Sequence, residues 1–262
     1  MKKKSAWKVI LVLAILIFAG CLGKLGWDKY QDYRLDQEQK ATLKAIKSSV
    51  FVGETDGEEP QLPKGIKHGS EIDFKKLTNI NSDVYAWIYI PGTKVDYPIA
   101  QSSTDDTHYL KYNYKNEPQF AGCIYTEKRN SKSFTDPNTV IYGHNMRNNS
   151  MFGGLDLFKD EAYFNKNRNV YIYTEKKIYT YQIFAAYTTN DSHILKSNDF
   201  SKQDVFQTYL TNILRKRSME ANINKKMVVS SKDKIITLST CVGGAPNNRY
   251  LVQAVLKDER NT

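Results

Sequence analysis

Short runs of apolar residues, separated by turn residues, dominate the chain after residue 80. Eight of these runs are rich in the β-branched and aromatic side chains that suit a pleated, half-buried surface. They cover residues 84–90, 95–99, 121–126, 139–142, 170–174, 178–187, 235–240 and 250–256. Several short strands punctuated by turns favour a closed barrel or a sandwich. The pattern therefore predicts a mostly β domain.

Two segments of this domain have features of helices instead. Residues 70–73 read Ser-Glu-Ile-Asp, which resembles a capping box and predicts a short helix through Leu77. Further along, Ser201 is a candidate helix cap, with Asp204 three residues later. Apolar residues then recur at helical spacing, which predicts a helix that packs on the β domain; they are Val205, Phe206, Tyr209, Leu210, Ile213 and Leu214.

The N-terminal region carries the longest uncharged apolar run, residues 9–23, preceded by three consecutive lysines and Lys8. Residues 9–27 predict a single transmembrane helix, at the short end of the roughly 17–25 residues that a crossing needs. The side chains of Lys8 and Lys24 can reach the membrane–water interface, and Trp27 suits a position at the same interface. Because basic residues favour the cytoplasmic side, we expect the N-terminus inside and the catalytic domain extracellular, in a single-pass protein of the cell membrane.

Two other readings of this region stay open. A cleaved signal peptide fits the basic and apolar segments, although Ala-x-Ala spacing is missing near Cys21. Residues 18–21, Phe-Ala-Gly-Cys, are similar to an imperfect lipoprotein cleavage box. All three readings place most of the protein outside the cytoplasmic membrane.

The pattern divides the chain into three parts. Residues 1–27 form the basic tail and membrane anchor. Residues 28–69 form a helical stalk and linker, because 28–48 is charged and free of Gly and Pro, whereas 53–69 is rich in both. Residues 70–262 form the folded domain.

Composition narrows the function classes. A chain of 262 residues that is 40% hydrophobic and 12% aromatic can bury a core, which excludes wholesale disorder. The net charge of +10 owes much to the N-terminal lysines. The other basic cluster, residues 215–217, has no interleaved aromatic residues, so nucleic acid is not an expected partner. Three cysteines make a disulfide framework improbable.

Cys241 stands where a buried strand gives way to a Gly-Gly loop. This position suits a nucleophile, and on position alone it suits an inert thiol equally well. Cys123 lies within a strand and is expected to be an inert space-filling residue. No cluster of residues with metal-ligand spacing is visible in the sequence.

A nucleophilic cysteine needs a proton partner, which directs attention to the four histidines. His144 follows strand 139–142 directly after Gly143, at another strand end. We expect His108 to have a structural role, and His68 and His193 to be solvated loop residues. Arg249 begins the strand after Cys241, so a loop between adjacent antiparallel strands returns it close to the thiol.

These residues resemble a known signature. Residues 237–241, Thr-Leu-Ser-Thr-Cys, with Arg249 on the next strand and 142–146, Tyr-Gly-His-Asn-Met, are similar to the motifs of the sortases, the cysteine transpeptidases of Gram-positive cell surfaces. The resemblance spans roughly residues 80–256. The helical insertion at 201–217 before the cysteine strand and the helical N-terminal extension most resemble class B.

The resemblance implies an eight-stranded β-barrel with N-terminal helices, in which Cys241, His144 and Arg249 meet in one groove. Cys241 would attack the Thr carbonyl of a sorting signal near the C-terminus of a secreted protein, and His144 would protonate the leaving amine. An amine of the peptidoglycan precursor would then resolve the thioacyl enzyme. Arg249 would hold the substrate backbone or the oxyanion, and no cofactor is implied.

Three further residues are candidates for substrate binding. Ser239 shares the strand face of Cys241 by alternation, whereas Thr240 points the other way and can still donate a hydrogen bond near the groove. Asn145 follows His144 directly and is not required as a third catalytic member.

Two other functions stay open. An extracellular cysteine peptidase would use the same Cys-His pair with water as the acceptor. A non-catalytic surface protein, basic and tyrosine-rich, would bind anionic wall polymers.

Overall fold

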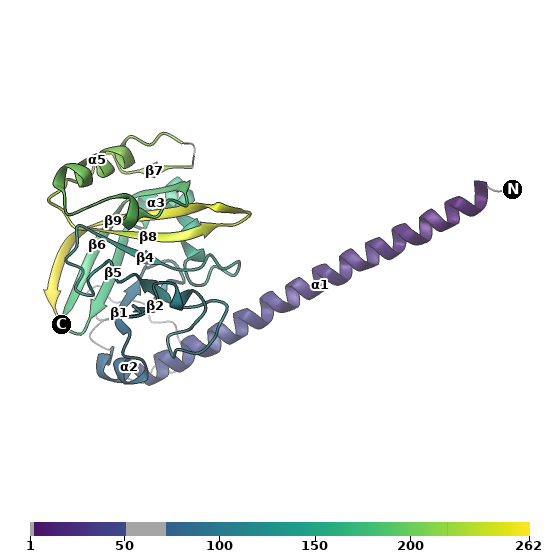
Figure 1. Cartoon of the computed structure of the whole chain (residues 1–262), viewed down its shortest axis with the longest axis horizontal. Helices are drawn as coiled ribbons and strands as arrows, with labels where there is room; N and C mark the ends of the chain where they lie inside the picture. The colour runs from purple at the N-terminus through teal and green to yellow at the C-terminus, as the bar shows by residue number, and fades with distance from the viewer. Residues whose placement is uncertain (1–2, 51–71, 219) are drawn as a thin grey trace. The chain divides into compact units, whose positions relative to one another are not determined.

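The computed structural model describes residues 3–50, 72–218 and 220–262, and its β-sheet closes into a barrel (Figure 1). The strand order is β5-β1-β2-β3-β4-β8-β9-β6, and β6 pairs back with β5 to close the ring. The eight strands are β1 (Val84–Tyr89), β2 (Asp96–Ala100), β3 (Ile124–Thr126), β4 (Asn138–Tyr142), β5 (Asn169–Thr174), β6 (Lys177–Asn190), β8 (Ile235–Val242) and β9 (Ala245–Asn261). The two-residue β7 (Asn222–Ile223) adds to β6. The predicted mostly β, eight-stranded barrel is confirmed.

The barrel contains both parallel and antiparallel strand pairs, and its two parallel pairs determine which strand ends lie at the same end of the barrel. β2 pairs with β3 and β4 with β8 in parallel, while the other pairs are antiparallel. In the β4–β8 pair Tyr142 lies opposite Ser239. The chain continues from these two positions to His144 and to Cys241, so both reach the same end of the barrel.

β6 and β9 extend well beyond the apolar runs at 178–187 and 250–256 that predicted them. They pair from Lys177 with Asn261 to Asn190 with Asn248. The extra pairs near the C-terminus involve exposed polar residues, to which a hydrophobic pattern does not respond. Backbone pairing therefore continues where the apolar alternation has ended.

The remaining helices are α1 (Lys3–Val50), α2 (Phe74–Ile80), α3 (Glu161–Lys166), α4 (Ile194–Ser197) and α5 (Gln203–Leu214), with 3-10 turns η1 (His108–Leu110) and η2 (Gly153–Lys159). Among the described helices, α1 holds the segment long and apolar enough to cross a membrane. The chain divides into two compact units, one through Lys44 and the other from Ala45. In the second unit, Ile46 is 2% exposed within a core cluster and Lys47 Nζ lies 2.5 Å from the Asp96 carboxylate.

Both predicted helices of the folded domain form, but neither begins at the expected cap. α2 is capped by Asp73, whose side chain accepts a hydrogen bond from the Lys76 amide at 3.0 Å. Ser70 lies outside the described residues. The expectation for Ser201 is wrong, because its hydroxyl donates to Asp199 at 2.6 Å and α5 begins after Lys202 without a side-chain cap.

The predicted packing of α5 on the barrel is confirmed. The buried stripe Phe206, Leu210 and Ile213 belongs to a core cluster that includes Phe184 of β6 and Leu251 of β9. The insertion before the cysteine strand is thereby fixed to the two strands that neighbour the site.

Candidate active site

Cys241 is exposed at the end of β8, just before the chain reverses into β9. The reversal uses Gly244 at φ +77°, a conformation that side chains with a Cβ rarely adopt. A register shift between Cys241 and Val242 then places Arg249 directly opposite Cys241 in the β8–β9 pairing. Two strand neighbours thus present a thiol and a guanidinium at one edge of the barrel.

Hydrogen bonds join the end of β4 to the end of β8. The Gly143 amide donates to the Ser239 carbonyl at 3.2 Å, and the Thr240 hydroxyl donates to the Gly143 carbonyl at 2.8 Å. The Asn145 amide group donates to the Cys241 carbonyl at 2.9 Å. These bonds fix the backbone on both sides of His144 relative to Cys241.

A glycine is required at position 143 because there is no room for a Cβ, and not because the backbone conformation demands one. A Cβ at this position would lie 2.5 Å from Ile124 Cδ1 and 2.8 Å from the Phe152 ring. Contacts this short do not occur between real atoms, so any larger residue would have to displace the Phe152 ring and the Ile124 side chain. The Gly before His144 is therefore a packing requirement of the site.

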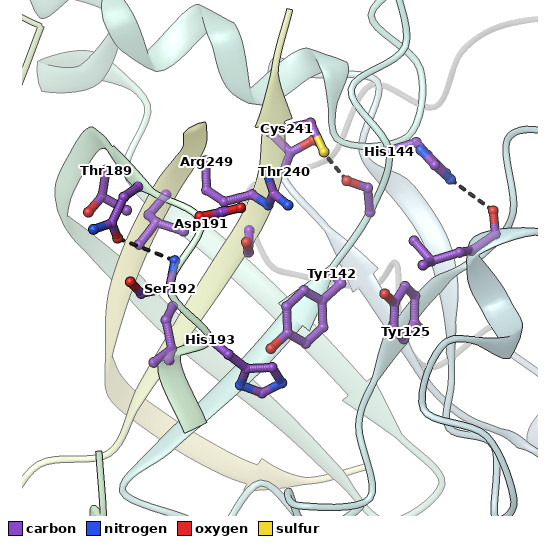
Figure 2. A pocket seen from close by; sticks show the side chains of 16 residues that line it. Tyr125, Tyr142, His144, Thr189, Asp191, Ser192, His193, Thr240, Cys241 and Arg249 are labelled. Atoms are coloured by element: carbon purple, nitrogen blue, oxygen red, sulfur yellow. Dashed lines mark hydrogen bonds between the residues drawn. The ribbon is translucent and has the colours of Figure 1, made fainter. Parts of the chain in front are cut away.

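The imidazole of His144 is held from two sides. Its Nε2 lies 2.8 Å from the Leu110 carbonyl oxygen (Figure 2). Phe120 stacks on the ring, with centroids 5.9 Å apart. A carbonyl only accepts hydrogen bonds, so Nε2 is the donor and carries a proton. Nδ1 is then the ring nitrogen that remains for proton exchange with a substrate or thiol.

A groove of about 400 Å³ runs past these residues. Its lining comprises Leu110, Tyr125, Tyr142, Gly143, His144, Thr189, Asn190, Asp191, Ser192, His193, Ile194, Ser239, Thr240, Cys241, Arg249 and Leu251. Figure 2 shows Thr189, Asp191 and Ser192 on one side and His144 on the other, with Tyr142 between them. An extended peptide chain fits such a groove alongside the thiol.

Two stacked tyrosines form part of the groove lining. The rings of Tyr125 and Tyr142 lie 5.3 Å apart. Burial, followed by the negative charge of Glu127, raises the pKa of both phenols far above the ordinary value. Both hydroxyls therefore stay neutral at physiological pH and contribute hydrogen bonds and apolar surface rather than charge.

The structure brings most of the candidate residues from the sequence into this groove. Cys241, His144, Arg249, Ser239 and Thr240 all line it. Asn145 is not among its described lining residues, because its amide is directed to the Cys241 carbonyl and also lies 3.4 Å from the Asp156 carboxylate. Asn145 thus contacts the cysteine strand itself.

The other cysteine and histidine residues have different positions. Cys123 is buried, as expected, and its Sγ lies 3.7 Å from the Pro98 carbonyl. His108 is part of η1 and stacks on Tyr112, whereas His68 lies outside the described residues. The expectation that His193 is an ordinary solvated loop residue is wrong, because it lines the groove and bonds to Glu127 at 2.9 Å.

Sequence reasoning missed several groove residues. The segment 189–194 contains Asn, Asp and Ser and has the composition of a solvated turn, so no signal in the sequence connected it to the site. Phe120 is 66% exposed and packs on His144 from a loop far from it in sequence. No periodic pattern marks such a contact.

The combination of an exposed thiol, an imidazole with a defined tautomer and a guanidinium suits acyl transfer, and comparison with known proteins agrees. The Sortase domain family matches residues 88–257 of this chain. The chain belongs to the sortase family. Sortase B of Listeria monocytogenes is 32% identical over 236 residues, covering 88% of this chain and 87% of its own length. Sortase B of Staphylococcus aureus is 28% identical, with 89% and 87% covered.

Solved sortase structures are also similar. Sortase B from Bacillus anthracis superposes with a TM-score of 0.66 at 30% identity, covering 87% of this chain and 98% of that one. Sortase B from Clostridium perfringens gives a TM-score of 0.61 at 36% identity, with 71% and 100% covered. These relatives are class B sortases, and they support a cysteine transpeptidase activity for this chain.

Proposed function

We propose that this sortase is anchored in the cell membrane through residues 9–27 and acts on secreted proteins that bear a C-terminal sorting signal. It cleaves the signal after Thr through a thioacyl enzyme and joins the protein to a peptidoglycan amine. The observation that carries this proposal is the exposed thiol of Cys241 opposite Arg249, in the groove that His144 also lines.

In the first half of the reaction, Cys241 Sγ attacks the carbonyl carbon of the Thr. The thiol proton passes to His144 Nδ1, because Nε2 is already committed to the Leu110 carbonyl. His144 then gives this proton to the leaving amine as the peptide bond breaks, which leaves a thioester on Cys241. Arg249 stabilises the negative charge that develops on the carbonyl oxygen.

In the second half, the incoming amine attacks the thioester carbonyl and gives up a proton to His144. A new amide bond forms, and the proton returns to the Cys241 sulfur, so the enzyme regains its starting state. The thioester retains enough acyl energy for an amide, provided that the amine outcompetes water. Ser239 and Thr240 line the groove beside Cys241, where a bound peptide would pass them.

Membrane attachment rests on α1. Its apolar segment is long enough to cross a membrane and follows a cluster of lysines. Because positive residues are retained on the cytoplasmic side, the catalytic barrel lies outside the cell. Both of the protein's partners, the secreted substrate and the wall amine, are found there.

The test uses the full chain in detergent micelles with quenched peptides that carry variants of a sorting signal, with and without an added amine. We expect cleavage and a new amide product from the wild-type chain, and neither from Cys241→Ala or His144→Ala. Hydrolysis without an amide product, at every amine concentration, would favour a cysteine peptidase instead. Cleavage by Cys241→Ala would refute the mechanism.

A further inference from the structure

Residues 189–194 form one wall of the groove, and strand pairing holds only part of this wall. It begins with the last two residues of β6, which pair with Arg249 and Asn248 of β9, and ends at the first residue of α4, a helix of four residues. It faces the His144 side of the groove across Tyr142 (Figure 2). A peptide bound beside Cys241 must lie between these two sides, so the position of this wall affects how the peptide binds.

His193 ties the wall to another part of the barrel. Its Nε2 lies 2.9 Å from the Glu127 carboxylate, and its Nδ1 accepts a hydrogen bond from the Lys196 amide at 3.2 Å. A backbone amide only donates, so Nδ1 carries a lone pair and Nε2 is the nitrogen that donates its proton to Glu127. The side chains are 27% and 11% exposed. A hydrogen bond to a carboxylate with this burial is stronger than a solvated one.

Glu127 is a rigid anchor for this bond. It directly follows β3, and the buried Gln101 amide donates to its carbonyl at 2.9 Å and to that of Asn130 at 2.8 Å. These bonds hold the backbone of the turn directly after β3, so Glu127 is attached to the barrel through its main chain. Residues 191–193 lie between β6 and α4, so the bond to Glu127 ties an irregular segment to the barrel.

The same carboxylate neighbours the strand end that carries His144. After burial, the negative charge of Glu127 is the next largest cause of the raised pKa of Tyr142, two residues before His144. Glu127 thus interacts with the groove residue Tyr142 as well as with His193.

We propose that Glu127 and His193 are positioning residues that hold the groove wall 189–194 at the distance from His144 that a peptide donor requires. The inference rests on the proposed function and adds to it the two residues that set the groove for its peptide substrate. Neither residue takes part in proton transfer to the substrate. Loss of their contact weakens peptide binding and leaves the reactivity of Cys241 unchanged.

A matched pair of substitutions at His193 separates the contact from the helix cap. His193→Asn keeps a good N-cap residue but is too short to reach Glu127. His193→Gln places an amide N–H at a reach similar to that of Nε2. In the full chain we would measure peptide cleavage, alkylation of Cys241 by a small thiol reagent, and backbone hydrogen exchange of residues 189–197.

We expect His193→Asn to speed amide exchange in 189–197 and to raise KM about tenfold, the scale of a lost hydrogen bond to a charged group. We expect kcat to change less than KM, the Cys241 alkylation rate to stay at the wild-type value, and His193→Gln to recover most of the KM. Glu127→Gln keeps an acceptor oxygen and should fall between the two.

Unchanged exchange in His193→Asn would overturn the tether, and faster exchange with an unchanged KM would overturn its role in substrate binding. Slower Cys241 alkylation would show that the variant disturbs the nucleophile, which also contradicts the proposal. A wild-type chain that cleaves no peptide would refute the proposed function instead, and the exchange data would still decide whether Glu127 and His193 fix the wall.

Discussion

The two cysteines of the barrel show how surroundings decide the behaviour of one functional group. Cys241 is exposed at a strand end beside Arg249, whereas Cys123 is 4% exposed within a core cluster. Burial raises the pKa of the Cys123 thiol to about 12. Because the thiolate is the reactive form, Cys123 is inert at any physiological pH. The sequence predicted an inert Cys123, whereas position alone left Cys241 open between a nucleophile and an inert thiol.

Alkylation of the native chain with iodoacetamide at pH 8 should therefore modify Cys241 and leave Cys123 unmodified. Cys123 stays unmodified because its raised pKa keeps the thiol protonated until the pH approaches 12. Peptide mass spectrometry distinguishes the two sites, and Cys123 should react once the protein is denatured. Equal labelling of both cysteines in the native chain would contradict the burial of Cys123.

At the scale of elements, the site depends on the parallel pair β4–β8 and on the hairpin β8–β9. The apolar runs located all eight barrel strands, and strand order then explained why His144 and Cys241 share one end. Parallel pairing itself is a long-range property that no local pattern specifies. The wall 189–194 and the Phe120 loop were missed for the same reason, because their roles depend on distant partners.

The junction of β4 and β8 gives a test at this scale. Thr240→Val removes the hydroxyl that donates to the buried Gly143 carbonyl at 2.8 Å. An unsatisfied buried carbonyl costs about 1–3 kcal/mol, so the free energy of unfolding should fall by that amount. The transpeptidation rate should also fall, because Gly143 precedes His144. Thr240→Ser keeps the hydroxyl and is the control.

Urea unfolding measures the stability of both variants. Equal stability of Thr240→Val and the wild type would show that the hydroxyl does not join the two strands. A loss of stability with full activity would show that this bond does not hold His144 in its catalytic position.

At the scale of the whole molecule, α1 belongs to both compact units of the chain. The unit from Ala45 includes the last turns of α1, in which Ile46 is buried with Phe74, Leu77 and Trp87. The sequence predicted a charged helix over 28–48 with only sparse apolar points, one of them Ile46. A single buried side chain at the end of a solvated helix leaves no periodic pattern, so its burial could not be predicted.

Ile46→Ala should lower the free energy of unfolding of the barrel by about 2–5 kcal/mol, through lost burial and the cavity left behind. The exposed neighbour Lys44→Ala should change it by less than about 0.5 kcal/mol. Thermal unfolding of the full chain in micelles provides the comparison. Equal melting temperatures for the two variants would show that α1 ends before the barrel core.

The central claim is that the Cys241 sulfur carries the acyl group between donor and acceptor. The most direct measurement is the intact mass of the full chain, quenched with acid soon after it is mixed with a sorting-signal peptide in the absence of amine. We predict a mass increase equal to the peptide fragment that ends in Thr, located on Cys241 after digestion, absent in Cys241→Ala and lost when an amine is added. Turnover without any adduct on Cys241, or an adduct on another residue, would contradict this account.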